Sequence, residues 1–141
     1  MKIFFDTNVY VAEALLGETA EEMLVATIRA SWRIHASSYQ LDELERVLIE
    51  QLGFSRRLAL VVRGRIIRRA NVVDPGASRH TVPLDLADTP ILRAAVAAGV
   101  DYLVTNDRHL LDLNPYEGVK IVSMTQYHRM LVIEGYIRPS S

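Results

Sequence analysis

Lys2-Ile3-Phe4-Phe5-Asp6-Thr7-Asn8 opens the chain with a short apolar, aromatic run that stops at a carboxylate. Such a run is typical of a buried strand. A second stretch of this kind, Tyr102-Leu103-Val104-Thr105-Asn106-Asp107, also ends at an acid. Strand-like stretches alternate with helical ones along the chain, which predicts right-handed crossovers and a mostly parallel sheet. We therefore predict an α/β fold, a three-layer sandwich with helices on both faces of the sheet.

The pattern of apolar residues, caps and glycines predicts the individual elements. The predicted strands are Lys2–Phe5, Trp32–His35, Asn71–Val73, Tyr102–Thr105 and Val119–Val122. The predicted helices are Asn8–Leu16, Thr19–Ile28, Tyr39–Leu52, a helix that starts at Ser55, Pro90–Ala98, Asp107–Leu111 and Thr125–Ile133. Gly17 is expected to end the first helix. The expected inner face of the fourth helix consists of Leu58, Val61, Val62, Ile66 and Ile67. No linker or repeat divides the chain, so we expect one domain over residues 1–141.

Composition narrows the class of protein. The chain has 141 residues, 50% of them hydrophobic, no cysteine and a formal net charge of −1. The lack of cysteine fits a reducing compartment. The carboxylate of Asp6 comes too early for a signal-peptide core, and no apolar run approaches the ~20 residues of a membrane span. We expect a cytoplasmic protein that does not bind membranes and does not coat nucleic acid by bulk charge.

Six arginines are concentrated in residues 55–70, a segment without any acidic residue. They are Arg56, Arg57, Arg63, Arg65, Arg68 and Arg69. The segment could line a groove that follows an RNA backbone. It could equally form a solvated helix face, or dock an acidic partner protein. The residues alone leave these interpretations open.

Four acids stand at positions where α/β proteins bind ligands. Asp6 and Asp107 follow predicted strands, Asp88 stands at a helix start, and Glu43 lies within a helix. Ligands of open parallel sheets bind beyond the carboxyl ends of the strands. Carboxylates that converge there repel one another, and Mg²⁺ or Mn²⁺ would relieve the repulsion. The aspartates could instead be helix caps, and the helical wheel does not select Glu43 over Glu45.

Other catalytic chemistries find no support in the sequence. No phosphate-binding glycine loop is present, and no serine or cysteine arrangement suggests a nucleophile. The histidines lack the spacing of a metal pair; they are His35, His80, His109 and His128. A phosphoacceptor receiver domain would need a lysine after a late strand, whereas Lys120 precedes Ile121.

Four segments, in order, resemble the motifs of PIN-domain proteins, in particular the VapC-like nucleases that form the toxin components of toxin–antitoxin pairs. They are Ile3–Asn8, Ser37–Leu48, Asp88–Ala95 and Asp101–Leu111. The resemblance implies a PIN-like α/β/α fold and a metal-dependent endoribonuclease that hydrolyses phosphodiester bonds in RNA. It also implies Mg²⁺ (or Mn²⁺) as cofactor, a cognate antitoxin and a homodimer.

The resemblance also assigns roles to residues. The catalytic, metal-binding acids would be Asp6, Glu43, Asp88 and Asp107. Asn8 and Thr105 would orient these carboxylates. Asp85 is an auxiliary ligand or, on the simpler interpretation, a solvated loop acid. His109 stands where many relatives carry a further acid, which leaves the number of metal ions open. The alternative function is a non-catalytic PIN-like module that binds RNA or a protein.

Overall fold

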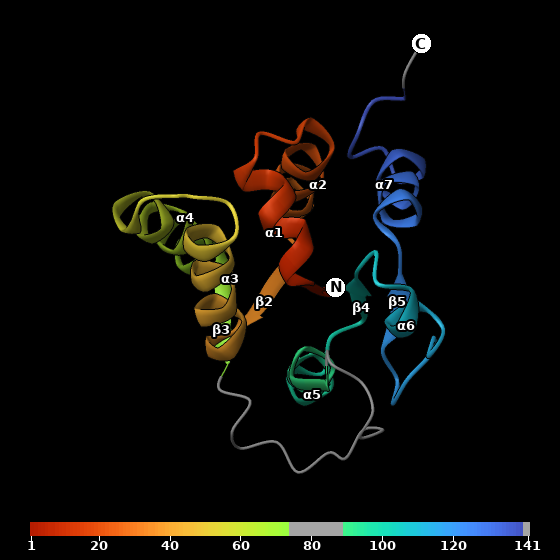
Figure 1. Cartoon of the computed structure of the whole chain (residues 1–141). Coiled ribbons are helices and arrows are strands. Elements are labelled where there is room, and N and C mark those ends of the chain that lie inside the picture. Colours follow the sequence, from red (N-terminus) through yellow and green to blue (C-terminus); the bar gives the residue numbers. More distant parts are fainter. Residues whose placement is uncertain (74–88, 140–141) are drawn as a thin grey trace.

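Parallel strands build the central sheet of the computed structural model, which describes residues 1–73 and 89–139 (Figure 1). The sheet strands are β1 (Lys2–Phe5), β2 (Arg33–Ser37), β3 (Ala70–Val73), β4 (Tyr102–Val104) and β5 (Lys120–Val122). Their spatial order is β3-β2-β1-β4-β5, and every neighbouring pair is parallel. The predicted parallel sheet is therefore confirmed.

The strand order reverses between β1 and β4, which lie side by side although they are far apart in the sequence. From β1 the chain continues to β2 on one side, whereas from β4 it continues to β5 on the other. Open α/β sheets form their ligand crevice at such a reversal. The residues that follow β1 and β4 therefore occupy the position where a site is expected.

Helices cover both faces of the sheet (Figure 1). They are α1 (Thr7–Ala14), α2 (Glu18–Arg29), α3 (Ser38–Glu50), α4 (Arg56–Arg69), α5 (Thr89–Ala98), α6 (Arg108–Leu111) and α7 (Met124–Ile133). Because side chains alternate along a strand, Phe5 packs in the core beneath α1, α2, α3 and α7, whereas Phe4 packs in a second core against α5. This arrangement confirms the three-layer α/β/α fold.

The helix and strand bounds agree with the predictions to within two residues wherever both ends were predicted. The prediction that Gly17 ends the first helix is wrong. Leu16 takes the left-handed conformation there (φ 62°), and Gly17 is the N-cap residue before α2, with φ −71°. Gly17 is required for a different reason. The carbonyl oxygen of Ala12 accepts a hydrogen bond from the Gly17 N–H at 2.9 Å, and a Cβ at position 17 would lie 2.7 Å from that oxygen.

The predicted inner face of α4 is also partly wrong. Val62 and Ile66 are buried as expected, but Leu58, Val61 and Ile67 are about half exposed. The cause is tertiary, because α4 packs against α3 and β3 and no helix of the described ranges covers its outer side. The apolar residues of α4 are therefore divided between core and surface.

Some predictions concern residues 74–88, which lie outside the described part of the chain. They include the turn at Asp74-Pro75-Gly76, the auxiliary acid Asp85 and the site residue Asp88. Within the described ranges, no helix is both long and apolar enough to cross a bilayer.

Candidate carboxylate site

Asp6 is the centre of the candidate site. It follows β1 directly and caps α1, and its Oδ1 accepts the N–H of Thr7 at 2.7 Å. Its own N–H donates to the Val104 carbonyl at 2.9 Å, so the link between β1 and β4 extends to the site itself. The side chain is only 3% exposed. A carboxylate is thus held in the interior at the carboxyl edge of the sheet.

Thr105 connects Asp6 to the second predicted acid, Asp107. The Thr105 hydroxyl donates to Oδ2 of Asp6 at 2.7 Å and accepts the backbone N–H of Asp107 at 2.9 Å. Asp107 in turn caps α6 by accepting the N–H of His109 at 2.8 Å. The residues after the two strands therefore lie together, and the Thr105 hydroxyl bridges the Asp6 carboxylate and the Asp107 backbone, while its role as an orienting residue of a metal site stays a prediction.

The electrostatics of Asp6 are those of a crowded carboxylate. Burial raises its pKa above the ordinary value, and the negative charge of Asp107 acts in the same direction. The hydrogen bonds from Thr105 and from the Thr7 N–H oppose the rise without cancelling it. A nearby positive charge would therefore favour ionised Asp6.

Glu43 belongs to the same electrostatic group. It lies in α3, half-buried, and its pKa is raised by burial and next by the charge of Asp6. Arg46 and the Thr7 hydroxyl oppose that rise. The Thr7 hydroxyl is buried and makes no hydrogen bond of good geometry with any described residue, although it is close enough to Glu43 to favour the ionised form. Glu43 therefore approaches Asp6 across the first turn of α1.

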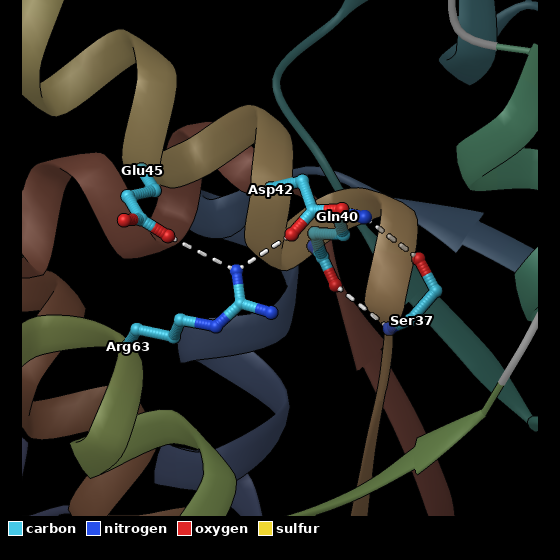
Figure 2. Close-up of polar contacts among 5 residues, drawn as sticks. All are labelled: Ser37, Gln40, Asp42, Glu45 and Arg63. Carbon is cyan, nitrogen blue, oxygen red and sulfur yellow. Dashed lines mark hydrogen bonds and ion pairs between the residues drawn. The ribbon is translucent and has the colours of Figure 1, made fainter. Parts of the chain in front are cut away.

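Glu45, the alternative that the helical wheel left open, points elsewhere. Its Oε2 accepts from Arg63 of α4 at 3.2 Å, and the same guanidinium nitrogen contacts Asp42 at 2.8 Å (Figure 2). Glu45 thus helps to hold α4 against α3, whereas Glu43 faces the sheet edge. The charge of Asp6 thus acts on Glu43, whereas Glu45 is held by Arg63, and the choice of Glu43 as a site residue stays a prediction.

One residue of the site region was missed by the sequence reasoning. Gln40 forms a capping box with Ser37 at the start of α3 (Figure 2). Its side-chain amide also donates to the carbonyl of Phe5, the residue directly before Asp6. The Ser-x-x-Gln spacing before an apolar helix is a known sequence signature of a helix start. That spacing could have identified the cap, though not the contact with Phe5.

The donor set fits a hard divalent cation in its chemistry. Asp6, Glu43 and Asp107 offer only carboxylate oxygens, the ligands that Mg²⁺ and Mn²⁺ prefer, and the pKa values of Asp6 and Glu43 are raised. Among residues 1–73 and 89–139, however, no three acidic or histidine side chains lie close enough together to bind one ion. Asp88 lies outside these ranges. Asn8 is exposed, and its orienting role stays a prediction.

The six arginines of α4 fall into two groups. Arg69 forms a bidentate pair with the buried Glu13 (2.8 and 2.9 Å), and Arg63 pairs with the acids of α3. The others are exposed to solvent: Arg56, Arg57, Arg65 and Arg68. Two of the six arginines therefore hold the fold together, and four are accessible to a partner.

A cavity of about 520 Å³ lies away from the carboxylates, between α2 and residues 135–138. Its lining includes Glu21, Glu22 and Arg138 but none of the predicted site residues. The chemistry-bearing groups at the strand ends, rather than this hollow, therefore mark the candidate site.

A parallel α/β fold with a buried carboxylate at the reversal of strand order is typical of a class of ligand-binding and catalytic domains. A model of the PIN domain matches residues 2–109, and the chain belongs to the PIN-domain family. A chain in the crystal structure of VapBC2 from Rickettsia felis, bound to a DNA fragment from their promoter, is similar in fold, with a TM-score of 0.63. It is 17% identical, and the match covers 87% of this chain and 98% of that one. No curated protein matches the sequence.

Proposed function

We propose that this PIN domain, taken as a single domain over residues 1–141, is a metal-dependent endoribonuclease that hydrolyses phosphodiester bonds in RNA. The observation that carries the proposal is the hydrogen-bonded series Asp6–Thr105–Asp107 at the carboxyl edge of the sheet, with Glu43 within electrostatic reach of Asp6. Membership of the PIN family supports a nuclease. The raised pKa values of Asp6 and Glu43 support a cationic cofactor.

In this proposal Asp6, Glu43, Asp88 and Asp107 hold Mg²⁺ or Mn²⁺. The cation would polarise the scissile phosphodiester and favour its attack by water. The protein supplies the arrangement of charge. Thr105 orients Asp6, and burial shields this carboxylate from solvent water that would compete for its oxygens. No side chain is assigned a covalent bond to the substrate.

The test is cleavage of a panel of structured and single-stranded RNAs, with and without EDTA. We expect cleavage with Mg²⁺ or Mn²⁺, loss of it on chelation, and loss of it in Asp6→Asn and Asp107→Asn. Activity that survives both chelation and these substitutions would show that the metal-nuclease proposal is wrong.

We further propose that the chain is the toxin of a type II toxin–antitoxin pair, acts in the cytoplasm and forms a homodimer. The similar fold in the Rickettsia felis VapBC2 complex supports a cognate antitoxin. Expression of the chain alone should arrest growth, and co-expression of a small protein encoded next to it should restore growth. Light scattering should give twice the chain mass of 15.9 kDa.

The RNA substrate would contact the exposed arginines of α4. Arg63 and Arg69 are already paired with acids, so we now assign possible phosphate contacts to the remaining ones. These are Arg56, Arg57, Arg65 and Arg68. Tyr39, 42% exposed in the first turn of α3, offers a ring on which an unpaired base could stack.

A second candidate function is a non-catalytic PIN-like module that binds RNA or a protein. It is favoured by His109, which is exposed where a further acid would stand in many relatives. Calorimetric titration with Mn²⁺ separates the two functions. Firm RNA or protein binding without Mn²⁺ binding at millimolar concentration supports the module, whereas Mn²⁺ binding supports the nuclease.

A further inference from the structure

Gln40 is a buried polar residue beside the carboxylate site to which the proposed reaction gives no role. Its side chain is 0% exposed, and its Nε2 donates to the carbonyl of Phe5. Its Oε1 accepts the N–H of Ser37 at 3.4 Å, and its own N–H donates to the Ser37 hydroxyl at 3.0 Å (Figure 2). A single side-chain amide therefore joins the end of β1 to the beginning of α3.

The register of the sheet explains where this amide stands. At the start of the β1–β2 ladder, the N–H of Arg33 donates to the Met1 carbonyl at 2.8 Å. In a parallel ladder such donors recur at every second residue. Continued in steps of two residues from the Arg33–Met1 hydrogen bond, the ladder would therefore bring the N–H of Ser37 to the carbonyl of Phe5. Instead the amide of Gln40 is inserted between the two, accepting from Ser37 and donating to Phe5.

The inserted amide separates β1 from β2 at the edge where Asp6 lies. It also ties the first turn of α3 to the residue before Asp6. Glu43 follows Gln40 by three residues, which places the two side chains next to each other on the helix surface. A movement of Gln40 relative to β1 would therefore move Glu43 relative to Asp6.

We propose that Gln40 is a positioning residue of the carboxylate site: its amide holds α3 at the separation from β1 at which Glu43 and Asp6 act on one divalent cation. The inference rests on the proposed metal-dependent function and deepens it. Gln40 itself touches neither substrate nor metal.

The chain contains a matched control. Ser123 and Gln126 form a second capping box at the start of α7, with N–H···Oε1 and N–H···Oγ distances of 2.8 and 3.1 Å. Gln126 is exposed and has no further contact comparable to that with Phe5 among the described residues. Gln126→Met thus removes a capping box alone, whereas Gln40→Met also removes the bridge to β1. Ser37→Ala removes the hydroxyl cap at α3 and leaves the bridge in place.

The experiment measures the dissociation constant of Mn²⁺ from the free-ion electron paramagnetic resonance signal, together with the melting temperature. We expect Gln40→Met to raise the constant about tenfold or more, as loss of a residue that supports metal ligands does. Gln126→Met and Ser37→Ala should change it less than twofold, although both lower the melting temperature. Equal Mn²⁺ affinity in folded Gln40→Met and wild type would overturn the inference. A loss of Mn²⁺ affinity in Ser37→Ala as large as that in Gln40→Met would also overturn it.

A double-variant cycle tests whether Gln40 acts through Glu43. In a Glu43→Gln background, Gln40→Met should change the Mn²⁺ constant less than twofold. The same tenfold change in both backgrounds would overturn the inference. Should Gln40→Met fail to fold, Gln40→Asn replaces it, because the shorter amide cannot span Ser37 and Phe5 and should lose the same affinity.

A metal-free measurement gives an independent readout. The side-chain amide protons of Gln40 should exchange with solvent far more slowly than those of Gln126. Equal exchange rates would contradict the proposed bridge of the Gln40 amide between Ser37 and Phe5. The two proposals fail differently. Wild-type protein that binds no Mn²⁺ and cuts no RNA contradicts both, whereas wild-type binding matched by Gln40→Met contradicts only the role of Gln40.

Discussion

Thr105 donates its hydroxyl proton to Asp6 at 2.7 Å while the same oxygen accepts the backbone N–H of Asp107 at 2.9 Å. One buried hydroxyl thus connects the acids that follow two adjacent strands. It also lowers the pKa of Asp6, against the effect of burial. The site depends on this contact for both its geometry and its charge.

Replacement of Thr105 by valine tests the contact. Valine keeps the volume but removes the donor to Asp6 and the acceptor for the Asp107 N–H, so the pKa of Asp6 should rise further. We expect metal-dependent RNA cleavage to fall roughly 10–100-fold, the usual cost of losing a group that orients a metal ligand. Thr105→Ser keeps the hydroxyl and is the control. Wild-type activity in Thr105→Val would contradict the role assigned to the hydroxyl.

The raised pKa of Asp6 predicts a pH-dependent effect on stability. Because its pKa is higher in the folded chain than in the unfolded one, Asp6 favours folding at low pH and this contribution is lost as the pH rises through the raised value. In metal-free protein, Asp6→Asn should therefore raise the melting temperature at pH 7, on the order of a few degrees, and lose this advantage near pH 4. Asparagine is an equally good helix cap.

Thermal melts in EDTA at several pH values check this expectation. Addition of Mn²⁺ at pH 7 should stabilise the wild type but not Asp6→Asn. A variant less stable than wild type at every pH would contradict the view that ionised Asp6 destabilises the metal-free fold.

The ion pairs of α4 should differ strongly in their contribution to stability. Arg69 and Glu13 are largely buried (side chains 18% and 7% exposed), so Arg69→Met leaves a buried charge unpaired and should cost about 3–5 kcal/mol in the free energy of unfolding. Arg63→Met, whose partner Asp42 is 74% exposed, should cost about 1 kcal/mol or less. Urea unfolding measures both.

A double variant controls this comparison. Arg69→Met combined with Glu13→Leu should recover most of the stability that Arg69→Met removes, because no charge then remains buried. Equal costs for Arg69→Met and Arg63→Met would contradict the assignment of Arg69 to the fold rather than to RNA.

The exposed arginines of α4 predict how RNA binding responds to salt. For single-stranded RNA, removal of one arginine–phosphate pair should reduce the slope of log affinity against log salt by about 0.7. Substitution by glutamine of Arg56, Arg57, Arg65 and Arg68 together should therefore flatten this dependence. Arg63→Gln is the control and should leave it nearly unchanged. An unchanged slope in the fourfold variant would exclude α4 from the RNA-binding surface.

The fold was largely predictable because its signals are local. The apolar run before Asp6, the serine caps at Ser37 and Ser55, and the left-handed glycines Gly53 and Gly99 after α3 and α5 each depend on a few neighbouring residues. The proximity of Asp6 and Asp107 was also predictable, since parallel strands bring their carboxyl ends to one edge of the sheet.

What could not be predicted depends on the surroundings of each helix. The helical wheel of α3 gives the angle between Glu43 and Glu45 but not which of them meets the sheet and which meets Arg63. For the same reason, the pattern of α4 could not show that Leu58 and Ile67 lie on an uncovered side. The bridge from Gln40 to Phe5 joins distant segments and has no local signal beyond the cap.

The central claim, that a carboxylate site on the sheet edge performs metal-dependent RNA cleavage, is tested most directly by two neighbouring variants of α3. Cleavage of an RNA substrate in Mn²⁺ is measured for wild type, Glu43→Gln and Glu45→Gln. Both substitutions remove one charge from the same helix, but the charge of Asp6 acts on Glu43, whereas Glu45 pairs with Arg63. We predict a loss of at least 100-fold in kcat, or about 2.7 kcal/mol, for Glu43→Gln, with near wild-type cleavage by Glu45→Gln. Equal activity of the two variants would contradict the account.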